Sequence, residues 1–325
     1  MLTLHNIDTI IEESLSTVDL SGEPEELYAP VNYYFSMGGK RLRPKMALVA
    51  YTLFSEEINR SILYPAIGIE IFHGFTLIHD DIMDNAPIRR GMATLHKRWN
   101  NNTAILSGDV MCIKSYQYIA ECPPEYIDRI MPIFSRTAAK VCEGQQYDMN
   151  FERYPFITME EYINMIGLKT AVLIAASAQI GAIIAGAPDS VAEALYNYAY
   201  QLGLAFQIKD DYLDSFGECA LFGKQIGGDI LCNKKTWLQT ESFRVADAET
   251  NRELTALMMS ENLPPEEKIG KVLDIYRRLG VQSAAKEAMA LRHRAAIEAL
   301  DAVQLTQSQR KQLTDFALSL INREK

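Results

Sequence analysis

Apolar residues recur at steps of three and four along almost the whole chain, and this spacing constrains the fold more than any other feature of the sequence. Ile7, Ile10, Ile11 and Leu15 form the first such stripe, the pattern of a helix with one buried face. Similar stripes cover 44–54, 62–84, 104–120, 127–144, 159–166, 171–185, 191–214, 236–246, 265–279, 281–300 and 308–321. No convincing alternating pattern of a strand lies between them. The sequence therefore predicts an all-α fold.

Breaks rich in proline and glycine separate many of the stripes, at 21–24, 122–124, 186–189 and 263–265, where turns are favoured over helices. Asp189 precedes one stripe and Ser308 begins another, and both residues are expected N-caps. No long linker or low-complexity stretch divides the 325 residues. We therefore expect one domain over residues 1–325.

The charge balance restricts the classes of partner. The chain has 32 Lys and Arg against 42 Asp and Glu, a net charge of −10. General nucleic-acid binding needs a basic surface and is therefore not expected. A local group of cations can still bind phosphate, so phosphate-bearing small molecules remain possible ligands.

The sequence predicts a cytoplasmic protein with no stable membrane span. Its five cysteines contain no CxxC pair, which favours reduced thiols over disulfides or a zinc site. The first 16 residues carry acids and no basic leader, so a signal peptide is not expected. The most apolar run, 171–187, contains Ser177 and Gln179. It falls just short of a membrane span of about 20 residues and is interpreted as a core helix.

Two acidic clusters share one spacing, and each follows a mostly apolar segment. Carboxylates four residues apart lie on one helical face, where their repulsion destabilises the helix unless a cation compensates it. Oxygen ligands without Cys or His favour Mg²⁺. One cluster alone is as typical of an acidic surface patch, but two copies followed by basic residues favour a metal site. The clusters consist of Asp80, Asp81 and Asp84, and of Asp210, Asp211 and Asp214.

Basic residues near these clusters are candidate diphosphate ligands. Gly38-Gly39 precedes three cations and allows a close backbone approach to an anion. His73 lies two helical turns before Asp80 on the same face. Taken singly, each cation is equally typical of a solvated surface. The candidates are Lys40, Arg41, Arg43, Arg89, Arg90, Lys169, Lys224, Lys234 and Lys235.

Together these motifs resemble the polyprenyl synthetases, the trans-isoprenyl diphosphate synthases that include farnesyl and geranylgeranyl diphosphate synthases. The resemblance covers residues 38–237 in family order and implies a helical bundle around a deep central cavity. The matching stretches are 38–44, 77–84 with 89–91, 144–145, 169–170, 206–214, 223–224, 227–229 and 233–236.

The resemblance also implies a role for each residue. Asp80, Asp84 and Asp210 would hold three Mg²⁺ ions, supported by Asp81, Asp211 and Asp214. The diphosphate of isopentenyl diphosphate would be bound by Lys40, Arg43, His73 and Arg90. The diphosphate of the allylic substrate would be bound by Arg89, Lys169, Thr170, Gln207, Lys224 and Lys234. The three metal-binding aspartates, Arg89 and Lys169 would carry the catalysis.

The implied reaction is condensation of isopentenyl diphosphate with dimethylallyl, geranyl or farnesyl diphosphate. In the family, bulk just before the first cluster limits the product, and here Phe72, Phe75 and Thr76 occupy that stretch. The large Phe75 favours geranylgeranyl or farnesyl diphosphate. A longer-chain synthase stays open as an alternative, and a terpene cyclase or a non-catalytic subunit is less favoured because both clusters are intact. A homodimer is expected from the family.

Overall fold

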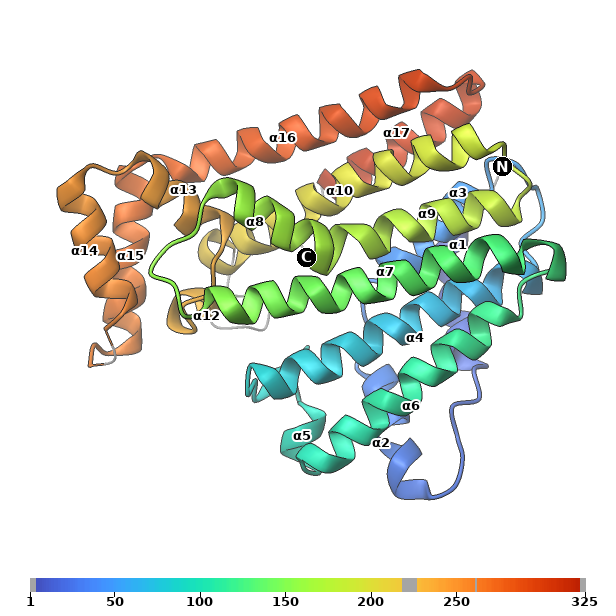
Figure 1. The fold of residues 1–325 in the computed structure, drawn as a ribbon, viewed down its shortest axis with the longest axis horizontal. Helices are drawn as coiled ribbons and strands as arrows, with labels where there is room; N and C mark the ends of the chain where they lie inside the picture. The colour runs from blue at the N-terminus through green and yellow to red at the C-terminus, as the bar shows by residue number, and fades with distance from the viewer. Residues whose placement is uncertain (1–3, 218–226, 261, 322–325) are drawn as a thin grey trace. The chain divides into compact units, whose positions relative to one another are not determined.

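The computed structural model describes residues 4–217, 227–260 and 262–321, and almost all regular structure within them is helical (Figure 1). This confirms the predicted all-α class. The helices are α1 (Leu4–Ser16), α2 (Glu25–Ser36), α3 (Leu42–Tyr51), α4 (Arg60–Met83), α5 (Leu95–Arg98), α6 (Asn101–Ala120), α7 (Pro124–Phe151), α8 (Met159–Ile166), α9 (Val172–Ile184), α10 (Asp189–Phe216), α12 (Gly228–Leu231), α13 (Trp237–Val245), α14 (Ala248–Met258), α15 (Pro265–Arg278), α16 (Val281–Ala299) and α17 (Gln307–Ile321).

Three short elements complete the described part. A π-helical turn, Gly167–Ala171, joins α8 to α9, and a 3₁₀ turn, Leu300–Ala302, follows α16. The strands β1 (Ile88–Arg89) and β2 (Met92–Ala93) pair antiparallel, with Ile88 opposite Ala93.

The chain divides into two compact units. Unit 1 consists of residues 1–136, 173–196 and 303–313, and unit 2 of residues 137–172, 197–302 and 314–325. The helices α7, α9, α10 and α17 contribute residues to both units. The expectation of one domain over residues 1–325 stays a prediction.

Unit 1 is built around α4. Its Ile67, Ile71 and Ile78 belong to a core with Val31 and Met111 of α2 and α6. The helix begins where Asn59 accepts a hydrogen bond from Ser61 N–H, which satisfies one of the unpaired amides of the first turn. This packing fixes the end of α4, where the first acidic cluster lies.

Unit 2 packs α8, α10, α13 and α15 around a second core that includes Tyr162, Ile208, Leu238 and Val272. The helix α8 has the predicted bounds, and it opens with a capping box in which Thr158 and Glu161 bond reciprocally. Such a box satisfies two amides at once and gives the helix a sharp start.

Several local predictions were wrong or incomplete. Asp189 is the first residue of α10, and Ser308 lies inside α17, because Thr306 accepts the hydrogen bond from Gln309 N–H that caps this helix. The helices α2, α5, α12 and α14 and the two strands were not predicted. Most of them are short, and α14 buries only Leu254, Leu257 and Met258, so their apolar pattern is too weak to detect.

Two segments of the described residues are long and apolar enough to cross a membrane, Arg60–Met83 and Met159–Ile184. Such length and composition are weak evidence, because core helices of soluble proteins share them. Inside the structure, 61% and 83% of their most apolar windows are buried. This burial agrees with the interpretation of 171–187 as a core helix.

Candidate functional site

The first acidic cluster lies at the C-terminal end of α4 in unit 1. Asp84 is the C-cap residue, and its N–H donates to Asp80 O at 2.8 Å. The side chain of Asp80 is 17% exposed, whereas that of Asp81 is only 5% exposed. The helical spacing therefore separates an accessible carboxylate, suited to a ligand, from a buried one that must find a partner within the protein.

Arg89 is the partner of Asp81. Its Nε donates to both carboxylate oxygens, at 2.9 and 2.7 Å, and its terminal nitrogen lies 2.7 Å from Asp81 Oδ1. The same nitrogen is 3.7 Å from Asp80 Oδ2. Burial raises the pKa of Asp81, while the hydrogen bonds and charge of Arg89 act in the opposite direction. Arg89, a predicted diphosphate ligand, is thus held in place by Asp81 and lies beside Asp80.

Arg90 lies in the turn between β1 and β2. Arg90 and Gly91 both have positive φ, 52° and 78°, as a tight hairpin turn requires. The guanidinium donates to Gly38 O. A Cβ at Gly39 would lie 2.8 Å from the same guanidinium, so a side chain at this position would require Arg90 to shift. In the structure, the close approach that Gly38-Gly39 permits is made by Arg90.

His73 lies near several arginines of unit 1. Lys40 is exposed, Arg43 is buried and His73 is half-buried. Burial lowers the pKa of His73 well below its usual value, and Arg43, Arg90 and the neighbouring arginines lower it further. The imidazole is therefore neutral at pH 7 and offers one N–H donor within a cationic environment.

The predicted chain-length residues form an aromatic cluster on α4. The ring of Phe75 lies 5.3 Å from that of Phe72 and 4.8 Å from that of His79. Phe72 in turn meets Phe134 of α7 at 5.2 Å. Thr76 donates to His73 O. Because aromatic contacts hold Phe72 and Phe75 on several sides, their rings have little freedom to move.

The second acidic cluster lies near the end of α10 in unit 2, and its buried member has different partners. Asp211 accepts hydrogen bonds from Tyr162 Oη at 2.6 Å, Trp237 N–H at 2.8 Å and Gln207 Nε2 at 3.0 Å. Burial raises its pKa to about 7 against the effect of these donors. Thr170 donates to Gln207 Oε1 at 2.9 Å, so the two predicted diphosphate ligands are linked to the acidic cluster.

The remaining members of the cluster, Asp210 and Asp214, are half-buried. Asp214 accepts a hydrogen bond from Asp229 N–H at 3.1 Å. The first residues of α12 are thereby joined to the end of α10. The predicted ligand Lys224 lies outside the described residues.

Two acids that the sequence analysis missed, one near the end of α7 and one directly after it, hold Lys169 and Lys234. Asp148 lies 2.7 Å from Lys169 Nζ and 3.4 Å from Lys234 Nζ, and Glu152 lies 3.0 Å from Lys234 Nζ. Burial acts to raise the pKa of Asp148, but the two lysines outweigh it and keep the pKa below its usual value. The available signal was the Gly144-Gln145 motif, because Asp148 follows Gly144 by one helical turn on the same face.

The aspartates suit a hard cation by the chemistry of their donors. Among the residues that the structure describes, no three carboxylate, histidine or cysteine groups are gathered to hold a metal by themselves. Mg²⁺ is usually bound by one or two carboxylates with water and substrate phosphates. The accessible Asp80, beside Arg89, fits such a partial ligand set.

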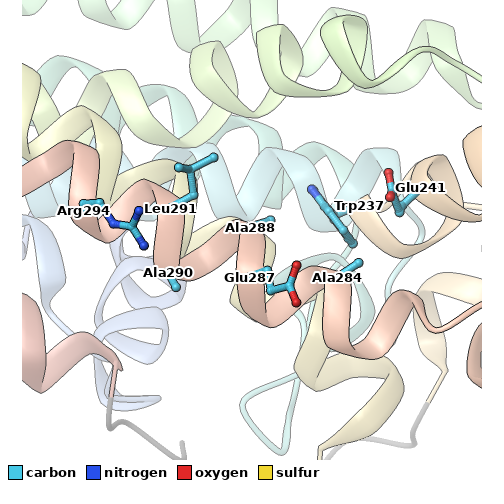
Figure 2. Close-up of a pocket in the computed structure, with 8 residues that line it drawn as sticks. All are labelled: Trp237, Glu241, Ala284, Glu287, Ala288, Ala290, Leu291 and Arg294. Atoms are coloured by element: carbon cyan, nitrogen blue, oxygen red, sulfur yellow. The ribbon is translucent and has the colours of Figure 1, made fainter.

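A groove of about 490 Å³ lies between α13 and α16 in unit 2. Figure 2 shows Trp237 and Glu241 of α13 on one side and residues 284–294 of α16 on the other. None of the predicted metal, substrate or chain-length residues that the structure describes lines this groove.

Comparison with known proteins decides the family. The model of the polyprenyl synthetase family matches residues 24–276. The chain belongs to the polyprenyl synthetase family. The match starts after α1, and it covers all the predicted site residues, from Lys40 to Lys234.

Relatives in the family agree along most of the chain. A geranylgeranyl diphosphate synthase of Methanosarcina mazei is 40% identical over 240 residues, which are 73% of this chain and 72% of that protein. A short chain isoprenyl diphosphate synthase of Methanocaldococcus jannaschii is 38% identical over 279 residues, 85% and 84% of the two chains. A crystal structure of a geranylgeranyl pyrophosphate synthase has a TM-score of 0.93 and 40% identity, with both chains covered completely.

Proposed function

We propose that this chain condenses isopentenyl diphosphate with an allylic diphosphate to form a linear trans-prenyl diphosphate. It is a prenyltransferase of isoprenoid biosynthesis, a short-chain isoprenyl diphosphate synthase. The main support for this proposal is that the family match contains both acidic clusters and all the predicted diphosphate ligands, including the one outside the described residues. Relatives at 38–40% identity are named for the same reaction class.

The family generally depends on Mg²⁺. We propose three ions, with Asp80, Asp84 and Asp210 as direct ligands. When bound, Mg²⁺ neutralises the charge that develops on the leaving diphosphate. The buried Asp81 and Asp211 act by holding Arg89 and Gln207.

Cationic and neutral donors of the chain bind the two substrates. In unit 1, Lys40, Arg43, Arg90 and the neutral His73 bind the diphosphate of isopentenyl diphosphate. As the family resemblance implies, the allylic diphosphate is bound by Arg89, Lys169, Thr170, Gln207, Lys224 and Lys234. Fixed donors stabilise a leaving diphosphate without reorganising during the reaction. Asp148 and Glu152 supply that fixation for Lys169 and Lys234.

The chemistry that these residues support has three steps. The allylic C–O bond breaks and its electron pair leaves with the diphosphate. The double bond of isopentenyl diphosphate then forms the new C–C bond, and a proton is lost to the departed diphosphate. Water must be kept from the cation, and apolar helices suit this because their backbone groups are already paired.

The product is geranylgeranyl or farnesyl diphosphate. Phe75, held between Phe72 and His79, limits growth of the prenyl tail. The enzyme acts as a homodimer in the cytoplasm.

Product analysis tests the function. The purified chain is given isopentenyl diphosphate with dimethylallyl, geranyl or farnesyl diphosphate, and the products are identified by mass spectrometry with Mg²⁺ and with EDTA. We expect linear products of three or four isoprene units that require Mg²⁺. A cyclic hydrocarbon formed from an allylic diphosphate alone would show a terpene cyclase. Absence of any Mg²⁺-dependent diphosphate release would favour a non-catalytic subunit.

A substitution at Phe75 tests the limit on length. The Phe75→Ala variant should shift the product toward longer chains, because it removes one ring of the aromatic cluster. Phe156→Ala is the matched control, since this phenylalanine is 58% exposed and lies outside the cluster. Wild-type products longer than about five units would contradict the short-chain assignment.

A further inference from the structure

The three cations that follow Gly38-Gly39 have different surroundings. Lys40 is exposed, whereas the guanidinium of Arg41 is buried, with 5% of its side chain accessible. Arg41 donates to Glu70 Oε1 at 3.0 Å, and this carboxylate is only 3% exposed. The middle cation of the motif is therefore bound to a buried protein carboxylate, whereas we assign the outer two, Lys40 and Arg43, to the substrate.

The backbone at Arg41 is held in a left-handed conformation. Its φ and ψ are 49° and 33°, at the N-cap position of α3. A residue with a Cβ adopts this conformation at a cost, and it persists where surrounding contacts hold it. The buried ion pair supplies such a contact. It fixes the chain between Lys40 and Arg43 and so determines where these two side chains begin.

Glu70 connects this turn to His73. The two residues are three apart on α4 and hence neighbours on its surface. Glu70 Oε2 and the hydroxyl of Tyr34 are buried and have no hydrogen-bond partner within the described residues. Burial raises the pKa of Tyr34, while the nearby charge of Arg90 lowers it. The ion pair thus lies within the same polar group of residues as His73 and Arg90.

The helix α1 reaches the same segment from outside the family match. Glu12 lies 3.3 Å from Arg41 Nε, and Asp8 lies 2.5 Å from Lys45 Nζ. The two acids are four residues apart and share one face, while Ile7 and Ile11 beside them are buried. The family model begins at residue 24, so these contacts are additional to the matched part of the chain.

We propose that Arg41 and Glu70 are positioning residues for the isopentenyl diphosphate site, and that α1 strengthens them through Glu12 and Asp8. The proposal rests on the proposed function, which assigns Lys40, Arg43, His73 and Arg90 to this diphosphate. Arg41 does not contact substrate. It sets the direction in which Lys40 and Arg43 leave the backbone, and its loss weakens binding of one substrate only.

Steady-state kinetics with both substrates varied test the proposal. The double variant Arg41→Gln/Glu70→Gln replaces the ion pair by two amides and leaves no unpaired buried charge. We expect the KM for isopentenyl diphosphate to rise about tenfold, with kcat and the KM for the allylic substrate within about twofold of wild type. A folded double variant with unchanged KM values, or with both KM values raised alike, would overturn the proposal.

A second pair of variants decides the question if the double variant does not fold, as judged by circular dichroism. Asp8→Asn/Glu12→Gln should raise the KM for isopentenyl diphosphate about two- to threefold. Glu13→Gln is the matched control, because Glu13 is an exposed acid of the same helix and should leave both KM values unchanged. Equal kinetics in these two variants would refute the role of α1.

One further variant separates this inference from the proposed function. Lys40→Ala should raise the KM for isopentenyl diphosphate whether or not Arg41 has a positioning role. If Lys40→Ala has that effect and the Arg41 double variant does not, only the inference fails. An inactive wild-type chain would refute the function itself.

Discussion

The two acidic clusters have the same spacing, yet their buried members are held by different chemistry. In unit 1, Asp81 is paired with the cation Arg89 through both carboxylate oxygens. In unit 2, Asp211 receives donors that carry no charge, from Tyr162, Gln207 and the backbone of Trp237. The same sequence motif is therefore stabilised by an ion pair in unit 1 and by neutral hydrogen-bond donors in unit 2. Removal of the charge should cost much more in unit 1, because Arg89 then loses its nearest anionic partner.

Substitution of Asp80 or Asp210 should have similar effects on activity, whereas substitution of the two buried aspartates should have different effects on stability. Asp80→Ala and Asp210→Ala should each lower kcat by at least about a hundredfold and leave the helix content nearly intact. Turnover and circular dichroism measure the two effects. Asp109→Ala is the control, because Asp109 is a half-exposed carboxylate of α6. An active Asp80→Ala enzyme would contradict the metal assignment.

The comparison of the buried aspartates is tested by stability. Asp81→Asn should lower the free energy of unfolding by about 3 kcal/mol, the typical cost of breaking a buried ion pair. Asp211→Asn should cost about 1–2 kcal/mol, because only hydrogen bonds are lost and burial already disfavours the charge. Urea denaturation at one pH measures both. The reverse order of the two losses would show that the charge of Arg89 is not the deciding factor.

A single hydroxyl in unit 2 should have a smaller effect. Tyr162→Phe removes one of three donors to Asp211 and should cost about 1 kcal/mol of unfolding free energy. Tyr154→Phe provides the control, since Tyr154 is 50% exposed. This substitution should change the unfolding free energy by at most a few tenths of a kcal/mol. Equal losses in the two variants would mean that the Asp211 hydrogen bond contributes nothing measurable.

The histidine His293 should make the stability of the protein depend on pH. Burial, with a smaller effect from Lys209, lowers the pKa of His293 to about 4 from 6.5. Between these values the unfolded chain binds more protons than the folded one, so stability rises with pH over this window and falls on acidification. The unfolding free energy of wild type relative to His293→Gln should fall by about 1–2 kcal/mol from pH 7 to pH 4.5. A difference that does not change with pH would contradict burial as the cause.

The sequence predicted most of the helices because each one carries its own periodic pattern, although α7 extends to Phe151, seven residues beyond the predicted stripe. The bounds of α8 agree at both ends, and α13 and α15 agree within a residue. Elements such as α5, α12 and the pair β1–β2 were missed. They have four residues or fewer, too few for a period to show, and they depend on contacts such as Thr94 Oγ1 to Ala86 O.

The sequence alone determined the secondary-structure class and the motifs. The chain is all-helical, it has two aspartate clusters, and the order of its basic motifs resembles one enzyme family. These properties depend on spacing within a few residues or on residue identity. Only the tertiary structure decided which charged side chains form ion pairs. It turned Arg41 toward Glu70, set Arg89 against Asp81, and joined Lys234 to Asp148, 86 residues away. Such pairings are decided by burial, because a buried charge needs the partner that the fold brings near it.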